Sequence, residues 1–333
     1  MLSIKENYDE IDFDEIEKRH LEYCRKKFQI AIKKPNGNIS NEVLRYIKDF
    51  ENEDNFKKLI LGDINELSNI AIEFGKKIAV TKKIREDIKK LFNYDAFKGQ
   101  KKEWCGYKLS GLLNIEVCPY CNRQYTTTLI KRDQKNIYKG VTRPEFDHFI
   151  PKSKYPILQL SLYNLIPSCP ICNHIKRAED VFKTSGSKEI KYLNPYNGGF
   201  GKVGKFSWVL QSEEISEKIP SIKSIKIKIN VDEKDKLYEK VNENIEVFKL
   251  EDLYNEAHRD VVAELIAKKR LHPGNYIESV STLFGKHKLP QQEVYRLALG
   301  NYCADRELGK RPLSKLTKDI ALELGLIDKD FIK

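Results

Sequence analysis

Apolar residues recur at helical spacing through most of the first 110 positions. The clearest run of such residues is Val43, Leu44, Ile47 and Phe50. The same spacing resumes over residues 59–70 after a break, and Asp63 is a suitable N-cap for that second helix. Glycine and proline are sparse here, so we predict that residues 1–110 form an N-terminal helical region.

Residues 111–182 follow a different pattern, because helical periodicity fades while Pro, Cys, Tyr and Thr become more frequent. Three short stretches are typical of strands: RQYTTTLI at 123–130, PEFDHFI at 144–150 and NLIPS at 164–168. Residues 171–182 contain no helix breaker and are predicted to form a helix. This segment is therefore a small mixed module that differs from its helical surroundings.

Beyond this module, residues 183–231 are predicted to be a loop with short strands, in which 183–220 are loop. The segment NPYNGGFGKVGKF is rich in glycine, whereas IKIKI at 225–229 alternates strictly and predicts a half-exposed strand. Residues 232–333 return to helical patterns, in which 237–270 fit one long helix or two and 314–327 fit a compact amphipathic helix. We expect a mainly helical α+β protein with its mixed module between two helical regions.

The composition is that of a soluble globular protein, with 40% hydrophobic and 33% charged residues among 333. The length is typical of two domains. No run of about 18 apolar residues is present, and the acidic N-terminus lacks the layout of a secretory signal, so we expect a cytoplasmic protein without a membrane span. A net charge of +11 suits a polyanionic partner such as nucleic acid, although lysines that merely solvate helix faces give the same excess.

The seven cysteines are more informative in their spacing than in their number. Cys118 and Cys121 form CPYC, Cys169 and Cys172 form CPIC, and 47 residues separate the two pairs. Two CxxC pairs can close on one metal ion as a tetrahedral four-sulfur site, which zinc prefers, whereas a redox centre needs only one pair. Because four thiolates leave no position for water, we predict a structural zinc site. The remaining cysteines are expected to be small buried or unreactive thiols: Cys24, Cys105 and Cys303.

Polar residues capable of chemistry lie between the cysteine pairs and just after them. Asp147 and His148 are adjacent within FDHFIPKS, Asn164 follows in LYNLIPS, and Asn173 comes directly after the last cysteine. Each has an ordinary interpretation, since an adjacent Asp and His can lie in an exposed turn and an asparagine can cap a helix. Taken together, the order DH, N, CxxCNxxK resembles the motif of the HNH, or ββα-metal, endonucleases. The resemblance covers residues 118–182.

The resemblance implies a metal-dependent endonuclease built on a zinc-stapled ββα-metal module. In that family the carboxylate, here Asp147, binds the metal, and the histidine, here His148, activates water. The middle asparagine, here Asn164, braces the loop between the two strands and helps to hold the histidine. Asn173 replaces the final histidine of the motif as a metal ligand. On adjacent strand positions, Asp147 and His148 would point to opposite faces unless a twist or bulge intervenes.

The chemistry of phosphodiester hydrolysis fits these residue types. The reaction needs a nucleophile, neutralisation of charge on the phosphate and help for the leaving oxygen, and a hard cation such as Mg²⁺ or Mn²⁺ supplies the last two. Such ions prefer oxygen ligands, which Asp147 and Asn173 offer, while a histidine with a pKa near neutrality suits a general base. Lys176 and Arg177 are candidates for contacts with nucleic-acid phosphates, and Glu145 for assistance in metal binding.

A weaker resemblance concerns the layout outside the motif. CPYCNRQY early in the chain and KRPLSKLTKDI near its end are similar to bacterial Septu-type HNH nuclease subunits, which are encoded beside an ATPase in anti-phage defence. This resemblance implies an ATPase partner protein. DNA is the expected substrate, and cleavage of RNA such as tRNA is the alternative within the same chemistry. Two other possibilities are a non-catalytic zinc module that binds nucleic acid, and an adaptor in which zinc merely joins two helical arms.

Overall fold

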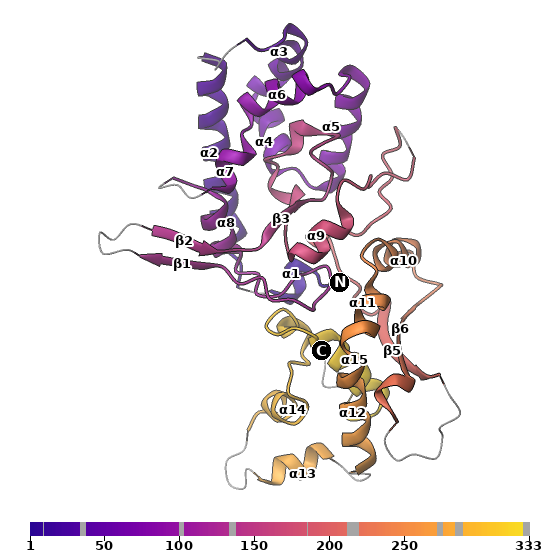
Figure 1. Cartoon of the computed structure of the whole chain (residues 1–333). Coiled ribbons are helices and arrows are strands. Elements are labelled where there is room, and N and C mark those ends of the chain that lie inside the picture. The colour runs from indigo at the N-terminus through magenta and orange to yellow at the C-terminus, as the bar shows by residue number, and fades with distance from the viewer. Residues whose placement is uncertain are drawn as a thin grey trace. The chain divides into compact units, whose positions relative to one another are not determined.

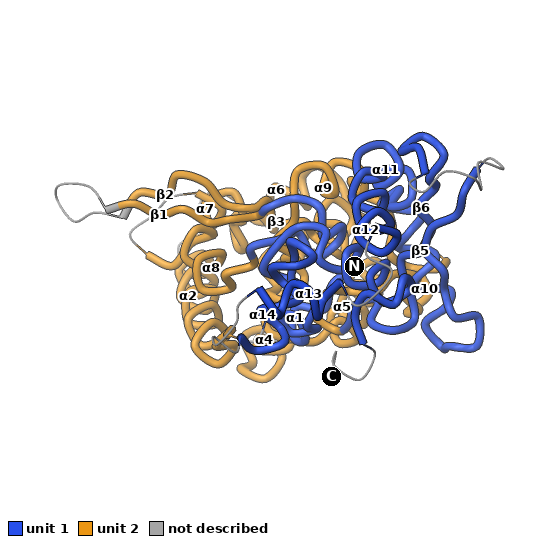
Figure 2. The backbone as a smooth tube through the Cα atoms, turned by 90° about the horizontal axis from the view of Figure 1, so that it is seen from below, with its two compact units in different colours: residues 1–9, 116–125, 198–333 blue, residues 10–115, 126–197 orange. Residues whose placement is uncertain are grey.

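The computed structural model describes most of the chain: residues 1–8, 10–33, 38–99, 103–132, 138–184, 186–211, 220–271, 276–283 and 289–328. Within these residues the fold is α+β, as predicted, with many helices and small antiparallel sheets of two strands (Figure 1). The chain divides into two compact units, which Figure 2 distinguishes by colour. Unit 1 comprises residues 1–9, 116–125 and 198–333, and unit 2 comprises residues 10–115 and 126–197. The division of the sequence at 110, 182 and 231 remains a prediction.

Unit 2 begins with a series of helices, in agreement with the helical spacing of its apolar residues. Its helices are α2 (Phe13–Lys33), α3 (Asn41–Ile47), α4 (Glu53–Leu61), α5 (Ile64–Lys77), α6 (Lys82–Leu91), α7 (Tyr94–Lys98) and α8 (Gly106–Leu113). Aromatic rings pack in their core, where the ring centroid of Phe28 lies 5.1 Å from that of Phe56 and 5.2 Å from that of Phe92. Asp63 caps α5 as predicted, because its carboxylate accepts N–H bonds from the first turn while Glu66 bonds back to the N–H of Asp63.

The remainder of unit 2 holds two antiparallel strand pairs. These are β1 (Leu129–Arg132) with β2 (Tyr138–Thr142), and β3 (Glu145–His148) with β4 (Leu165–Ser168), followed by α9 (Pro170–Lys176). The order β3, β4, α9 is the ββα arrangement expected within residues 111–182, and α9 packs on β3 (Figure 1). The strands predicted at 144–150 and 164–168 are confirmed. Two short 3-10 turns lie in the loop between β3 and β4, at Pro156–Leu158 and Leu162–Asn164.

The strand predicted at 123–130 begins only at Leu129, so that prediction is wrong for most of its length. The residues before Leu129 close a tight turn instead, in which the N–H of Cys118 donates to Gln124 O at 2.9 Å. The hydroxyl of buried Thr126 donates to a backbone carbonyl at 2.7 Å. The β-branched and aromatic residues that indicated a strand therefore complete the turn around the first cysteine pair.

The helix predicted at 171–182 ends at Lys176, so the prediction is wrong beyond that residue. Arg177 adopts a left-handed φ of 50°, which no helix accommodates. The chain changes direction at this turn. Val181 and Phe182, the last two residues of the predicted helix, lie outside α9 and are buried. No glycine or proline marks this stop, which is why the sequence pattern did not reveal it.

Unit 1 contains a third strand pair, β5 (Gly204–Leu210) and β6 (Ile225–Val231), which are antiparallel. The strand predicted at 225–229 is confirmed, and its isoleucines are buried at alternate positions. β5 lies in the segment predicted to be a loop, so that prediction is wrong for residues 204–210. The glycines that precede β5 obscured its alternation, in which Phe206 is buried while Lys205 is exposed.

Unit 1 also contains α1 (Ile4–Asn7) and a series of helices toward the C-terminus, where the sequence predicted helical patterns. These are α10 (Tyr238–Val247), α11 (Leu250–Ala257), α12 (Arg259–Leu271), α13 (Tyr276–Leu283), α14 (Gln291–Leu299) and α15 (Ser314–Glu323). The prediction of one or two helices over 237–270 is wrong, because Lys249 adopts a left-handed φ of 49° and α11 ends at Ala257, which divides this segment among three helices. Across the described ranges of both units, a helix with the length and hydropathy of a membrane span is absent.

Candidate active site

The cysteines of the two CxxC pairs form one buried cluster. Their Sγ atoms all lie within 4.8 Å of one another: Cys118, Cys121, Cys169 and Cys172. In a tetrahedral site with Zn–S bonds of about 2.3 Å, the sulfurs are about 3.8 Å apart, so the donor set and its spacing fit zinc. In each pair one sulfur also accepts a backbone N–H at 3.4 Å, from Arg123 in the first pair and from Cys172 in the second. The other cysteines are buried as predicted: Cys24, Cys105 and Cys303.

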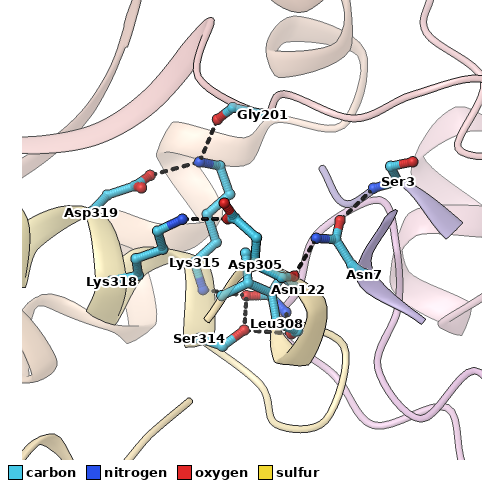
Figure 3. Close-up of polar contacts among 10 residues, drawn as sticks. All are labelled: Ser3, Asn7, Asn122, Gly201, Asp305, Leu308, Ser314, Lys315, Lys318 and Asp319. Carbon is cyan, nitrogen blue, oxygen red and sulfur yellow. Dashed lines mark hydrogen bonds and ion pairs between the residues drawn. The ribbon is translucent and has the colours of Figure 1, made fainter. Parts of the chain in front are cut away.

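The residue after the first cysteine pair caps α15 within unit 1 (Figure 3). Asn122, at a left-handed φ of 52°, accepts the N–H of Lys315 at 3.0 Å and the hydroxyl of Ser314 at 3.1 Å on its side-chain oxygen. Its side-chain nitrogen donates to Leu308 O at 3.1 Å, and the N–H of Leu313 donates to its backbone carbonyl at 2.6 Å. α15 has no capping side chain of its own, so Asn122 caps it from a distant part of the sequence.

Two lysines of α15 are internal. Lys315 Nζ donates to Asp319 at 2.9 Å and to Gly201 O at 3.2 Å, and Lys318 Nζ pairs with Asp305 (Figure 3). The side chain of Lys315 is 5% exposed and that of Lys318 is 10% exposed. Both lysines therefore stabilise the fold of unit 1, and their charge does not contribute to an outer surface for nucleic acid.

The ββα segment of unit 2 borders a pocket of about 570 Å³. β3 contributes Asp147 and His148 to it, and α9 contributes Asn173. The three residues predicted to surround the metal and the attacking water therefore line one pocket. Asp147 and His148 are neighbours on a strand, yet both reach it, because His148 is the last residue of β3, where strict alternation of side chains ends. Three basic or titratable residues also line the pocket: Lys152, His174 and Arg177.

One ring nitrogen of His148 is already bonded. Nε2 lies 3.0 Å from Gln159 O, and a carbonyl can only accept, so Nε2 carries a proton and the neutral ring keeps its lone pair on Nδ1. Tyr94 packs edge-on against the ring, with the two ring centroids 4.5 Å apart. Burial, and after it the charge of Lys152, lowers the pKa of His148 to about 3. The imidazole is therefore neutral at physiological pH, and its pKa lies below the near-neutral value expected from the sequence, so the ring alone is a weak base.

Asn164 lies in the loop between β3 and β4 and is fully buried. Its side-chain oxygen accepts the N–H of Ile150 at 2.6 Å, and its nitrogen donates to Ile150 O and Leu158 O, each at 3.1 Å. Its backbone carbonyl accepts the N–H of Phe149 at 2.9 Å. These bonds tie the residues that follow β3 to the end of the loop. This geometry is consistent with the bracing that the resemblance implied for the middle asparagine.

A buried ion pair holds the predicted metal ligand on β3. Lys176 Nζ lies 3.1 Å from Oδ2 and 3.2 Å from Oδ1 of Asp147, and it donates to His148 O at 3.1 Å. The side chain of Lys176 is 1% exposed and that of Asp147 is 2% exposed. This position argues against the predicted contact of Lys176 with phosphate, because its ammonium points inward onto the strand that carries Asp147 and His148.

Asn173 is oriented by Glu145 on β3. The side-chain nitrogen of Asn173 donates to Glu145 Oε2 at 2.6 Å. A carboxylate can only accept, so the amide nitrogen faces Glu145 and the amide oxygen is left for another partner. Glu145 was predicted as an aid to metal binding, and the structure places it against a predicted ligand. His174 and Arg177 are exposed where α9 ends.

Sequence reasoning did not single out Tyr94, Lys152 or Gln159. Lys152 Nζ lies 4.4 Å from the centre of the Tyr94 ring, and burial lowers the pKa of this lysine. Lys152 lies within FDHFIPKS, so its closeness to the Asp–His pair in sequence was a usable signal. Tyr94 comes from α7 and is brought to His148 only by the fold. Gln159 acts through its backbone carbonyl, which any residue could supply.

Comparison with known proteins identifies the family of this segment. No curated protein and no solved structure matches the chain. The family model described as HNH endonuclease matches residues 133–179. That range includes the residues of the ββα segment described above: Glu145, Asp147, His148, Asn164, Asn173 and Lys176. The chain therefore carries an HNH endonuclease domain at residues 133–179, and this domain supports a nuclease activity.

Proposed function

We propose that this chain is an endonuclease that hydrolyses phosphodiester bonds of DNA with a divalent cation. The observation that carries the proposal is the convergence of Asp147, His148 and Asn173 on one pocket, inside the segment that matches the HNH family. A carboxylate, an amide oxygen and a neutral imidazole are groups that a one-metal phosphodiesterase can use as ligands and base. They come from β3 and α9, which pack together.

Asp147 and Asn173 would hold the divalent cation, Mg²⁺ or Mn²⁺. The pocket supports this assignment because both residues line it and both carry side-chain oxygens, and hard cations prefer oxygen ligands completed by water and substrate. A bound cation neutralises charge on the scissile phosphate and on the leaving oxygen. Lys176 holds the carboxylate of Asp147, and Glu145 holds the amide nitrogen of Asn173. Such partners orient metal ligands in advance, so we assign Lys176 and Glu145 as positioning residues.

His148 is assigned the role of general base. Its Nε2 proton is donated to Gln159 O, so Nδ1 would take the proton of the attacking water as the new phosphorus–oxygen bond forms. A phosphate anion in the pocket raises the pKa of an adjacent imidazole, which strengthens the base when substrate is bound. Asn164 supports this step through the loop, because it bonds Leu158, the neighbour of Gln159, and Ile150, which follows β3.

Lys152 and Arg177 are proposed to contact the phosphates of the substrate. Both line the pocket, and Arg177 is exposed where α9 ends. A guanidinium presents paired N–H donors that match phosphate oxygens, so Arg177 is suited to this contact while the buried Lys176 is not.

A cleavage assay tests the proposal. With Mg²⁺ or Mn²⁺, the purified protein should nick or linearise supercoiled plasmid, and His148→Ala should slow this by about 100-fold or more. His258→Gln changes a histidine of unit 1 and serves as the matched control, with an unchanged rate. Equal rates for His148→Ala and the parent would contradict the general-base assignment, provided that both unfold at the same temperature.

The same assay separates the alternatives. A side-by-side digest of plasmid and tRNA decides between DNA and RNA as the preferred substrate. Binding of nucleic acid without cleavage, across a panel of divalent cations, would favour a non-catalytic zinc module. No affinity for nucleic acid even at low salt would favour the adaptor, since phosphate contacts are strongest there.

From the weaker resemblance we also propose a cytoplasmic role in anti-phage defence together with an ATPase partner. The support is the likeness of CPYCNRQY and KRPLSKLTKDI to Septu-type subunits. The test compares plasmid cleavage with and without an ATPase encoded beside this chain. A partner that neither binds the chain nor alters its cleavage would contradict this part of the proposal.

A further inference from the structure

The ribbon formed by β1 and β2 extends from the rest of unit 2 (Figures 1 and 2). Its register pairs Ile130 with Gly140 and Lys131 with Lys139, with a bulge just before Ile130. Among the described residues, β1 and β2 form a sheet of two strands, so neither has a second strand neighbour. A ribbon of this kind needs packing on one face to be stable.

The inner face of the ribbon packs on α8. A Cβ added at Gly140 would lie 2.3 Å from the ring of Tyr107, so only glycine allows the strand to lie this close to the helix. Its partner Ile130 approaches the same helix, since a Cβ added at Gly111 would lie 3.4 Å from Ile130 Cδ1. The face that carries Gly140 and Ile130 is therefore occupied by unit 2 itself.

The outer face of the ribbon carries the two opposed lysines. Side chains alternate along a strand, so Lys131 and Lys139 point away from α8, and both are exposed. Leu129 and Val141 lie two positions from them along the strands, beside the bulge, and are 42% and 50% exposed. The described residues of both strands include no Asp or Glu, and like charges directly opposite one another destabilise a strand pair. Folding therefore does not explain the lysine pair.

The base of the ribbon is fixed to the catalytic strand. β2 ends at Thr142 and β3 begins at Glu145, so only Arg143 and Pro144 separate the ribbon from the strand of Asp147. The guanidinium of Arg143 donates to a carbonyl of α7 at 3.0 Å and lies 5.1 Å from the centre of the Phe146 ring. Proline also limits rotation at this connection. The direction of the ribbon is thus set relative to the pocket.

We propose that the outer face of this ribbon docks into a groove of duplex DNA beside the scissile phosphate. The inference rests on the proposed nuclease function and adds the form of the substrate. The major groove of B-DNA, about 12 Å wide, admits a two-stranded ribbon. Lys131 and Lys139 then contact phosphates, while Leu129 and Val141 meet apolar groups within the groove.

The reach of the ribbon suits this role. From Lys139 to Asp147 the chain advances eight residues, which in extended strand spans at most about 26 Å. One helical turn of B-DNA is about 34–36 Å long. The lysine pair therefore grips the duplex within one turn of the cleaved bond.

The same geometry disfavours duplex RNA. The major groove of an A-form helix is deep and narrow and excludes protein elements, and its minor groove is wide and shallow. A ribbon with exposed lysines on one face fits the wider B-form groove better. We therefore expect the ribbon to discriminate between the two duplexes.

Binding experiments test the inference in a His148→Ala background, which prevents cleavage. Lys131→Ala/Lys139→Ala should weaken binding to a 30-base-pair DNA duplex by about 10-fold. It should also reduce the slope of log K against log salt by about 2, because each of the two lysines neutralises one phosphate. The control Lys57→Ala/Lys76→Ala removes two exposed lysines from α4 and α5 and should change neither quantity. An RNA duplex of the same sequence should bind more weakly to the parent and respond less to the ribbon substitutions.

The outcomes separate the ribbon from the nuclease. With His148 present, the ribbon variant should hydrolyse bis(p-nitrophenyl) phosphate, a small phosphodiester, at the parental rate. Unchanged duplex affinity in the ribbon variant would overturn the inference and leave the lysines as residues that only discourage pairing of strand edges. An equal decrease in affinity for RNA and DNA would overturn it as well. Failure of the parent to hydrolyse any phosphodiester would instead count against the nuclease function, whatever the ribbon binds.

Discussion

Each unit contains a buried Lys–Asp ion pair, and the two differ in what surrounds the carboxylate. In unit 2, Lys176 pairs with Asp147 at 3.1 Å, and the aspartate lines the pocket of about 570 Å³. In unit 1, Lys315 pairs with Asp319 at 2.9 Å, and Asp319 also accepts the N–H of Phe206. The same pair of residue types thus serves an open site in one unit and an enclosed network in the other.

Two histidines of unit 2, His20 and His148, show a similar contrast. His20 is 0% exposed, and both ring nitrogens are bonded, to Leu160 O at 2.7 Å and to the Trp104 N–H at 3.0 Å. His148 has one nitrogen bonded to Gln159 O and lines the pocket. Burial alone therefore does not identify a chemical group. What distinguishes Asp147 and His148 is their place on the wall of a pocket.

The cysteine cluster is buried, and changing it should have the largest effect. Cys169→Ser should lose most of the bound zinc and roughly 5 kcal/mol or more of stability, because zinc binding contributes about 10–16 kcal/mol in isolated zinc-finger peptides. Elemental analysis and urea unfolding measure the two quantities. Cys303→Ser changes a buried thiol outside the cluster and should keep its zinc. A parent protein that contains no zinc would contradict the assignment.

The two ion pairs should respond differently to a divalent cation. Lys176→Met and Lys315→Met each leave a buried carboxylate uncompensated, which costs about 3–5 kcal/mol. Millimolar Mn²⁺ should restore part of the stability of Lys176→Met, because Asp147 lines a pocket that admits the ion. It should not restore Lys315→Met, because Asp319 is bonded to the backbone of β5.

Urea unfolding with and without MnCl₂ measures this difference. The unfolding free energy of the parent in both conditions gives the baseline for any effect of the ion elsewhere. A similar gain in both variants would show that access to the pocket does not distinguish the two carboxylates, and the comparison between the units would lose its basis.

Much of the candidate site could be predicted from sequence because its parts are close together along the chain. Asp147, His148, Asn164 and Asn173 fall within 27 positions, and the cysteine pairs bracket most of this stretch. Strands β3 and β4 were also predicted from short β-branched and aromatic runs. The spacing of these residues along the chain was sufficient to predict that they meet, because a compact ββα segment leaves few ways to arrange its side chains.

The features that the sequence did not reveal depend on distant contacts or on backbone geometry. Lys176 was predicted to contact phosphate from its place one turn into the helix, and only the packing of α9 on β3 shows that it is buried. The end of α9 rests on the left-handed backbone of Arg177, a conformation that is uncommon for such a residue. Asn122 caps a helix nearly two hundred positions away. None of these has a local pattern that a reader of the sequence can find.

The pH dependence of stability offers a smaller test, which concerns the enclosed histidine His20. Burial lowers the pKa of His20 to about 4 from a usual 6.5, so between these values the unfolded chain binds more protons than the folded one. The contribution of His20 to the free energy of unfolding is therefore fully present above pH 6.5 and is lost as the pH decreases toward 4. Since each tenfold change in acidity corresponds to about 1.4 kcal/mol, the full contribution is about 3 kcal/mol.

His20→Gln should remove this part of the pH dependence. Glutamine can still donate to Leu160 O and accept from Trp104, but it does not titrate, so its unfolding free energy should fall less than that of the parent between pH 7 and pH 4.5. The difference between the two proteins isolates His20, because His148 and the carboxylates titrate in both. Parallel curves would mean that the ring of His20 accepts a proton while folded. Bonding of both ring nitrogens would then not be enough to keep a buried histidine neutral in the folded protein.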